Sequence, residues 1–253
     1  MSKNKQKKFQ EMRTFSRVFQ CGFRDLQNGS EVAQMAGHWN EQVFGNHHPI
    51  TLELGCGHGD YTVGLARQDV SRNFIGVDIK GARMWAGAKQ AEEENLTNVA
   101  FLRTQIEQLE HFFAPDEVDE LWITFPDPQM KKATKRLTST FFMQRYAKVM
   151  RAGGRIHLKT DSPFLYTYAR AMLQENGYVV LADTDDLYGT SDTPVLNQAK
   201  LLQTHYEKQW LDRGMKIKYL CWELQPKTDL HEPDIEIEKD TYRSYGRDYQ
   251  TKQ

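Results

Sequence analysis

The sequence is poor in the residues that build disulfides, metal centres and membrane spans. It has three cysteines among 253 residues, and their separation fits neither a disulfide framework nor a metal-ligand pattern. Such cysteine usage is typical of a reducing compartment, so we expect a cytoplasmic protein. The eight histidines are scattered, and we predict no metal site. No apolar run is long enough to span a bilayer, and the basic N-terminus leads into no apolar stretch, so we expect no membrane segment and no signal peptide.

The net charge is close to zero, at −1, but the charged residues are unevenly distributed along the chain. Residues 1–24 contain the bases Lys3, Lys5, Lys7, Lys8, Arg13, Arg17 and Arg24 against a single acid, Glu11. Acidic residues gather instead around 183–192 and 232–240. A chain that is neutral overall can therefore present a basic face. We expect a mobile basic arm at residues 1–30, one domain at 31–225, and a mobile polar tail at 226–253.

Apolar strand-like runs alternate with helical patterns through the middle of the chain. The predicted strands lie at 50–54, 74–78, 99–102, 117–125, 155–159, 178–181 and 216–224. Helical spacing is found at 61–66, 81–95, 137–150 and 163–176. This alternation predicts an α/β fold with a doubly wound, mostly parallel, seven-stranded sheet and right-handed crossovers.

A glycine-rich turn follows the first predicted strand. Residues 55–59 read Gly-Cys-Gly-His-Gly, and glycine lets a backbone approach a ligand closely. The next strand ends at Asp78, whose carboxylate can accept both hydroxyls of a ribose. The acid Glu53, just before the turn, would repel a pyrophosphate but suits the ammonium and sulfonium groups of S-adenosylmethionine. Alternatively, Glu53 is a strand residue paired with a nearby base.

The segment Phe-Pro-Asp-Pro at 125–128 closes the fourth predicted strand. Proline fixes φ and donates no backbone hydrogen bond, so the strand must stop and the turn is stiff. Asp127 is thus expected at the carboxyl end of a strand, where open α/β sheets bind ligands. The cations Lys131, Lys132, Lys135 and Arg136 follow at once. They indicate a polyanion lying across this rim, although a solvated face would also explain them.

Together these motifs resemble the bacterial tRNA (guanine-N7-)-methyltransferase family. The resemblance runs in order from the glycine loop to about Glu207, and includes Thr-Asp at 160–161 and Thr-His-Tyr-Glu at 204–207. It implies a Rossmann-like class I methyltransferase fold. It also implies methyl transfer from S-adenosylmethionine to N7 of a guanosine in the tRNA variable loop, position 46, by a monomer or homodimer. Gln129 stands where the family usually has tryptophan, and Gln105 where an acid usually contacts adenine.

The resemblance and the reaction chemistry assign roles to the candidate residues. The expected cofactor contacts are Glu53, Gly55, Gly57, Gly59, Asp78, Gln105 and Asp127. The expected tRNA contacts are Lys131, Asp161, Thr204, His205, Tyr206 and Glu207. Guanine N7 carries a lone pair and no proton, so Asp127 is expected to be catalytic through its negative potential and not as a base. A carboxylate at Asp161 or Glu207 could accept two adjacent guanine N–H donors, although Asp161 could instead cap the following helix.

Two other functions remain open. A class I methyltransferase with another RNA base, a protein or a small molecule as acceptor would share the glycine loop. It would not explain a basic segment beside Asp127 together with a basic N-terminus. A non-catalytic RNA-binding protein on the same scaffold would be expected to lose the cofactor residues, yet Glu53, the three glycines and Asp78 are all present.

Overall fold

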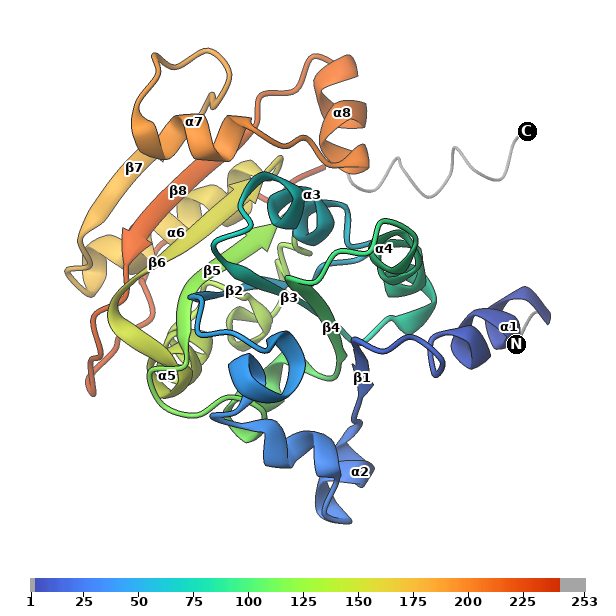
Figure 1. The fold of residues 1–253 in the computed structure, drawn as a ribbon. Coiled ribbons are helices and arrows are strands. Elements are labelled where there is room, and N and C mark those ends of the chain that lie inside the picture. Colours follow the sequence, from blue (N-terminus) through green and yellow to red (C-terminus); the bar gives the residue numbers. More distant parts are fainter. Residues whose placement is uncertain (1–2, 242–253) are drawn as a thin grey trace.

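The computed structural model describes residues 3–241 and is built around one eight-stranded sheet with helices on both faces (Figure 1). The strands are β1 Val18–Gln20, β2 Ile50–Leu54, β3 Asn73–Asp78, β4 Val99–Arg103, β5 Val118–Thr124, β6 Met150–Thr160, β7 Val180–Thr184 and β8 Lys218–Glu223. The α-helices are α1 Lys3–Glu11, α2 Phe23–Gln27, α3 Asp60–Gln68, α4 Gly81–Glu93, α5 Thr140–Val149, α6 Pro163–Glu175, α7 Pro194–Lys200 and α8 His205–Asp212.

The strand order, β1-β4-β3-β2-β5-β6-β8-β7, reverses direction between β2 and β5. From β2 the chain moves outward to β3 and β4, and it then returns to place β5 on the other side of β2. The pairs from β1 to β6 are parallel, whereas β8 runs antiparallel to both β6 and β7. The carboxyl ends of β2 to β6 therefore meet at one edge, with the order reversal at its centre, which is where such sheets bind ligands.

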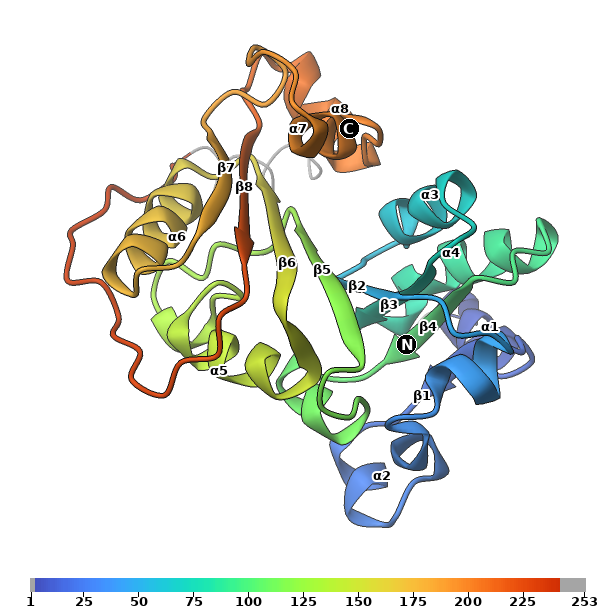
Figure 2. The ribbon, with the colours of Figure 1, turned by 60° about the vertical axis from the view of Figure 1, so that its left-hand side comes forward.

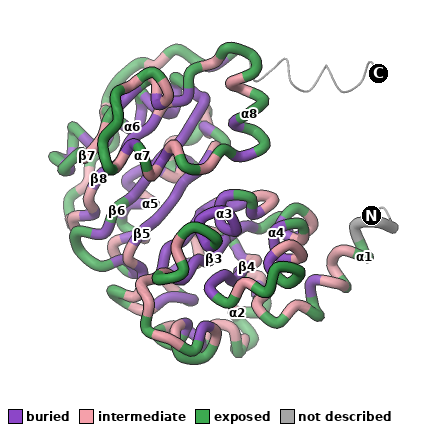
Figure 3. Tube along the Cα trace, turned by 45° about the horizontal axis from the view of Figure 1, so that its top comes forward, coloured by how far each residue is buried: buried purple, intermediate pink, exposed green. Residues whose placement is uncertain are grey.

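Each face of the sheet carries its own apolar core, and Figure 3 shows that the central strands between the two cores are buried. All five residues of β2 are buried, as expected for a parallel strand covered on both sides. On one face, Leu54 and Ile123 pack with residues of α5 and α6. On the other face, Phe101 and Trp122 pack with residues of α3 and α4. Figure 2 shows α5 and α6 on one side of the strands, with α3 and α4 on the other.

The N-terminal segment differs from the expected arm. Residues Val18–Gln20 form β1, an eighth strand that pairs with β4 at the edge of the sheet. Met12 is fully buried, and α1 packs on α4, where the Nζ of Lys8 lies 4.3 Å from the ring centroid of Trp85. The Trp85 indole also donates a hydrogen bond to Glu11 at 2.9 Å. The structure thus places residues 18–20 inside the sheet and docks α1 on the domain.

The described part of the C-terminal segment is also tied to the domain. The Glu232 carboxylate accepts hydrogen bonds from the backbone N–H of Thr140 at 3.0 Å and from the Tyr168 hydroxyl. Asp240 accepts from the backbone N–H of Phe164 at 3.0 Å and from the Ser162 hydroxyl. Residues 226–241 therefore run back past α5 to the start of α6. The rest of the expected tail, 242–253, lies outside the described residues.

None of the helices in residues 3–241 is long and apolar enough to cross a membrane.

Candidate active site

The glycine loop after β2 adopts a backbone that requires glycine. Gly55, Gly57 and Gly59 have φ angles of 75°, 56° and 79°, in the left-handed region. A Cβ added at Gly55 would meet nothing within 4 Å, so this side of the loop faces open space. A Cβ at Gly59 would instead lie 2.8 Å from the ring of Phe101. The loop is therefore packed against the sheet at its end and open to a ligand at its start.

Asp78 lies beside this loop at the carboxyl end of β3. Its Oδ2 accepts a hydrogen bond from the Gly57 N–H at 2.9 Å, and its Oδ1 accepts one from the Lys80 N–H at 2.7 Å. Each carboxylate oxygen has a further lone pair for a ligand hydroxyl. Ile79, the next residue, is 45% exposed, and Gln105 is exposed just beyond β4. The structure thus brings the glycine loop, Asp78 and Gln105 to the ends of three adjacent strands.

Glu53 is buried beneath the loop, and its hydrogen-bond partners are hydroxyl and amide groups. Oε2 accepts from the N–H and hydroxyl of Thr62 in α3, and Oε1 accepts from the hydroxyl of Thr124 in β5 at 2.6 Å. Burial raises the pKa of the Glu53 carboxyl to about 7, against the opposing effect of these hydrogen bonds. The residue therefore connects β2, α3 and β5 directly under the predicted cofactor site.

The turn at residues 125–129 holds Asp127 in a strained backbone. Phe125 and Gln129 both have φ of 48°, which is uncommon for residues with a side chain. The Phe125 N–H donates to the Lys159 carbonyl at 2.8 Å, which fixes the start of the turn to β6. Oδ1 of the exposed Asp127 accepts from the Gln129 N–H at 3.0 Å. Because β5 is the neighbour of β2, this turn and the glycine loop both leave the sheet at the order reversal.

The four cations after this turn are not equivalent. Lys131 and Lys132 are exposed, as a contact with a polyanion requires. Lys135 is paired with Glu107 at 2.8 Å. Arg136 is only 9% exposed. The expected polyanion surface thus consists of three exposed lysines, one of them paired with an acid, and one buried arginine.

Asp161 is fully buried at the end of β6. Its backbone carbonyl accepts a hydrogen bond from Lys218 at 3.2 Å. The alternative that Asp161 caps the following helix is wrong, because the cap of α6 is Ser162, whose hydroxyl accepts from the Leu165 N–H at 2.9 Å. A nucleobase could reach the Asp161 side chain only if neighbouring residues moved.

The segment 204–207 begins α8 and carries both buried and exposed candidates. Thr204 and Glu207 form a reciprocal capping box: the Thr204 hydroxyl accepts from the Glu207 N–H, and the Glu207 carboxylate accepts from the Thr204 N–H. His205 and Tyr206 are exposed. The Tyr206 ring stacks on His58 of the glycine loop, with 6.3 Å between ring centroids. The start of α8 therefore reaches the predicted cofactor loop through an exposed aromatic ring.

Lys159 is a residue of this region to which the sequence patterns gave no role. It is fully buried in β6, and its ammonium donates to the carbonyls of Ala199 and Leu202 at 2.8 and 2.9 Å and to Glu207 at 2.9 Å. The Tyr188 hydroxyl donates to the same carboxylate at 2.7 Å. The one feature of the sequence that could have indicated a buried ion pair was a lysine inside an otherwise apolar strand. Its partner, 48 residues later, could not be read from the pattern.

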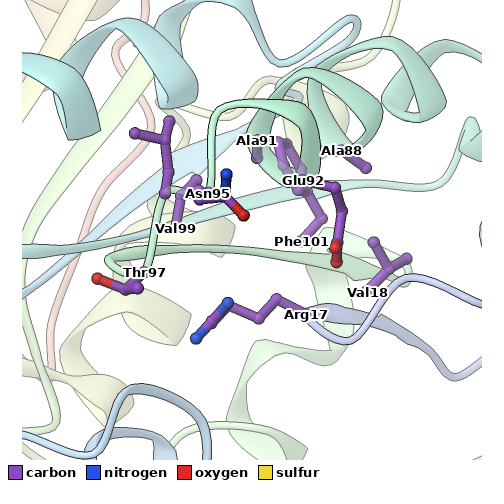
Figure 4. A pocket seen from close by; sticks show the side chains of 10 residues that line it. Arg17, Val18, Ala88, Ala91, Glu92, Asn95, Thr97, Val99 and Phe101 are labelled. Carbon is purple, nitrogen blue, oxygen red and sulfur yellow. The ribbon is translucent and has the colours of Figure 1, made fainter.

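Two hollows lie elsewhere on the molecule. One of about 110 Å³ lies at the amino end of β4, where Arg17, Asn95 and Thr97 line it (Figure 4). Another, of about 480 Å³, lies along α6 and β7. Neither is lined by a predicted site residue. Residues 3–241 contain no cluster of three or more His, Cys, Asp or Glu side chains suited to a metal ion.

Comparison with known proteins agrees with this geometry. Residues 47–220 match a family model described as "Putative methyltransferase". A tRNA (guanine-N(7)-)-methyltransferase of Porphyromonas gingivalis is 57% identical over 237 residues, which cover 93% of this chain and 96% of the relative. The chain belongs to this tRNA (guanine-N(7)-)-methyltransferase family. A relative of the same name from Bacteroides thetaiotaomicron is 51% identical, with 98% of this chain and 96% of that protein covered.

Solved structures show the same fold at much lower identity. The 16S rRNA methyltransferase KamB has a TM-score of 0.56 and 19% identity, covering 74% of this chain and 92% of its own. A structure described as an antibiotic related methyltransferase has a TM-score of 0.54 and 17% identity, covering 72% and 90%. The expected mostly parallel α/β fold of the class I methyltransferase type is thereby confirmed, with eight strands and not seven.

Proposed function

We propose that this protein transfers the methyl group of S-adenosylmethionine to N7 of a guanosine in tRNA, at position 46 of the variable loop. The observation that carries the proposal is that the glycine loop and the turn with the exposed Asp127 follow two paired strands. β2 and β5 are paired, with Leu54 opposite Ile123, so the two turns that follow them are neighbours. Membership of the tRNA (guanine-N(7)-)-methyltransferase family supports this choice over the other acceptors and over a non-catalytic RNA-binding protein.

The residues after β2, β3 and β4 fit the cofactor. Open space beside Gly55 leaves room for a ligand against the loop backbone. Asp78 can accept the ribose hydroxyls, and the exposed Gln105 amide can bond the adenine amine. When bound, S-adenosylmethionine supplies a methyl group activated by the sulfonium. Glu53 fixes the strand that carries the loop through its hydrogen bonds to Thr62 and Thr124.

Asp127 acts in this proposal without moving a proton. Guanine N7 has a free lone pair, and the methylated purine is cationic. A carboxylate fixed near the ring stabilises the charge as it develops, and it needs no reorganisation at that moment. The strained turn and the bond to the Gln129 N–H supply that fixed position.

The tRNA is expected to lie across the carboxyl edge of the sheet. Exposed Lys131 is placed to meet a phosphate just beyond Asp127. The exposed rings of His205 and Tyr206 offer a surface on which an unstacked base can rest. Thr204 and Glu207 hold these two residues at the start of α8 through the capping box. All three cysteines are free and buried, which suits the cytoplasm, where tRNA is found.

The proposal is tested by identifying the product. The purified protein is incubated with methyl-labelled cofactor and tRNA lacking 7-methylguanosine, and the RNA is digested to nucleosides. Label in 7-methylguanosine from the variable loop is the expected result. Label in another nucleoside would assign a different acceptor, and tRNA binding without transfer would favour the non-catalytic alternative.

A further inference from the structure

Arg136 follows a run of surface lysines but is itself enclosed. Its guanidinium carbon lies 4.8 Å from the ring centroid of Phe164 and 4.2 Å from that of Tyr168, both in α6. A planar guanidinium stacks well on aromatic faces, which a lysine ammonium cannot reproduce. Arg136 is therefore fixed against α6 and largely shielded from solvent.

The guanidinium also binds the backbone of the turn that carries Asp127. Its Nε donates to the Gln129 carbonyl and its Nη2 to the Met130 carbonyl, both at 3.3 Å. Gln129 is the residue with φ of 48° whose N–H binds the Asp127 carboxylate. A residue in such a backbone region is strained and persists only when its surroundings hold it there.

The aromatic residues behind Arg136 are held in turn by the C-terminal segment. The Tyr168 hydroxyl donates to Glu232, and Glu232 also accepts from the N–H and hydroxyl of Thr140 at the start of α5. The contacts thus run without a break from the C-terminal segment through Tyr168 and Arg136 to the Asp127 turn. Two of the guanidinium N–H groups that would grip a phosphate are already used.

We propose that Arg136 is a positioning residue that holds the Asp127 turn in its reactive conformation, and that it is not a tRNA phosphate contact. The inference rests on the function proposed above. It divides the basic segment into Lys131 and Lys132, which face the RNA, and Arg136, which faces the catalytic turn. The two roles predict different kinetic changes, because a positioning residue affects turnover and a phosphate contact affects RNA binding and its salt dependence.

The test compares Arg136→Ala with Lys131→Ala in steady-state assays over a series of salt concentrations. Arg136→Ala should lower kcat on the order of 10²-fold, the scale of a misplaced catalytic group, with KM for tRNA and the salt slope unchanged. Lys131→Ala should raise KM for tRNA. It should also make the slope of log KM against log salt concentration shallower by about one. Higher KM and a shallower slope in Arg136→Ala, with kcat retained, would overturn the proposal.

Two further variants separate positioning from charge. Arg136→Lys keeps the charge but cannot stack as a plane while bridging two carbonyls, so its kcat should stay low; full activity in this variant contradicts the proposal. Phe164→Leu removes one stacking ring and should lower kcat in the same direction by a smaller factor. Thermal unfolding identifies any variant that fails to fold, and Phe164→Leu then provides the kinetic test.

Hydrogen exchange makes the inference independent of the reaction. The backbone amides of Asp127, Gln129 and Met130 should exchange faster in Arg136→Ala than in wild type and should be unchanged in Lys131→Ala. Equal exchange in all three proteins overturns the positioning role even if the wild type methylates tRNA. If the wild type forms no 7-methylguanosine, the proposed function fails, and the exchange measurement still decides whether Arg136 holds the turn.

Discussion

The buried ion pair between Lys159 and Glu207 gives a stability prediction of definite size. Both side chains have no exposed surface, and the ammonium meets three oxygen acceptors. Lys159→Met keeps an unbranched side chain, one atom shorter than that of lysine, and removes the charge. Glu207 would then be a buried carboxylate without its cation, for which a loss of about 3–5 kcal/mol in the free energy of unfolding is expected.

Urea unfolding of the single and double variants measures this loss. Lys159→Met with Glu207→Met removes both charges, so the double variant should be more stable than Lys159→Met alone. It should remain below the wild type by about 1 kcal/mol for each polar group that loses its partner, namely the Tyr188 hydroxyl, the Thr204 N–H and the carbonyls of Ala199 and Leu202. A Lys159→Met protein within about 1 kcal/mol of wild type, or a double variant no more stable than the single one, would refute the reasoning.

Three other perturbations follow from the same structure. The folded-state pKa of Glu53, about 7, lies above its ordinary value of 4.5, so its contribution to stability should fall as pH rises between these values and then level off. Glu53→Gln should lack this pH dependence. Chemical denaturation at a series of pH values should therefore show the free energy of unfolding of Glu53→Gln, relative to that of the wild type, rising by on the order of 3 kcal/mol between pH 4.5 and 7. A difference between the two proteins that does not change with pH would contradict the raised pKa. Asp78→Ala should weaken S-adenosylmethionine binding by about 1–3 kcal/mol in calorimetry, and unchanged affinity would remove the ribose assignment. Replacing the exposed Lys7 and Arg13 with glutamine should lower tRNA affinity and make the salt slope shallower by about two, and an unchanged slope would show that α1 does not contact RNA.

The features that the sequence could predict are those set by local pattern. The glycine loop, Asp78 and Asp127 each stand directly after an apolar strand, so their place at the carboxyl edge followed from strand direction alone. β1 escaped prediction because it has three half-buried residues and no alternation of apolar and polar positions. A deletion of residues 1–24 would not isolate the effect of these basic residues on RNA binding, because it would also remove β1 and the buried Met12.

The partners of charged residues could not be predicted, because they are chosen by the tertiary fold. Arg136 and Lys131 are equally basic in the sequence, yet one meets aromatic rings from α6 and the other meets solvent. Glu207 looked available to read guanine, but Lys159 and Tyr188 enclose it. The T-x-x-E spacing at 204–207 did carry a local signal, since it is the pattern of a helix capping box.

The central claim is that Asp127 stabilises a developing cation and abstracts no proton, and single-turnover methylation of tRNA across pH tests it most directly. The wild-type rate should be flat from neutral to mildly alkaline pH, since nothing has to be deprotonated. Asp127→Asn keeps the shape of the side chain but loses its charge, so its rate should fall by roughly 10²–10³-fold, with tRNA and cofactor affinity little changed. An acidic limb in the wild-type profile that disappears in Asp127→Asn would instead identify a general base, and full activity in that variant would remove Asp127 from the chemistry.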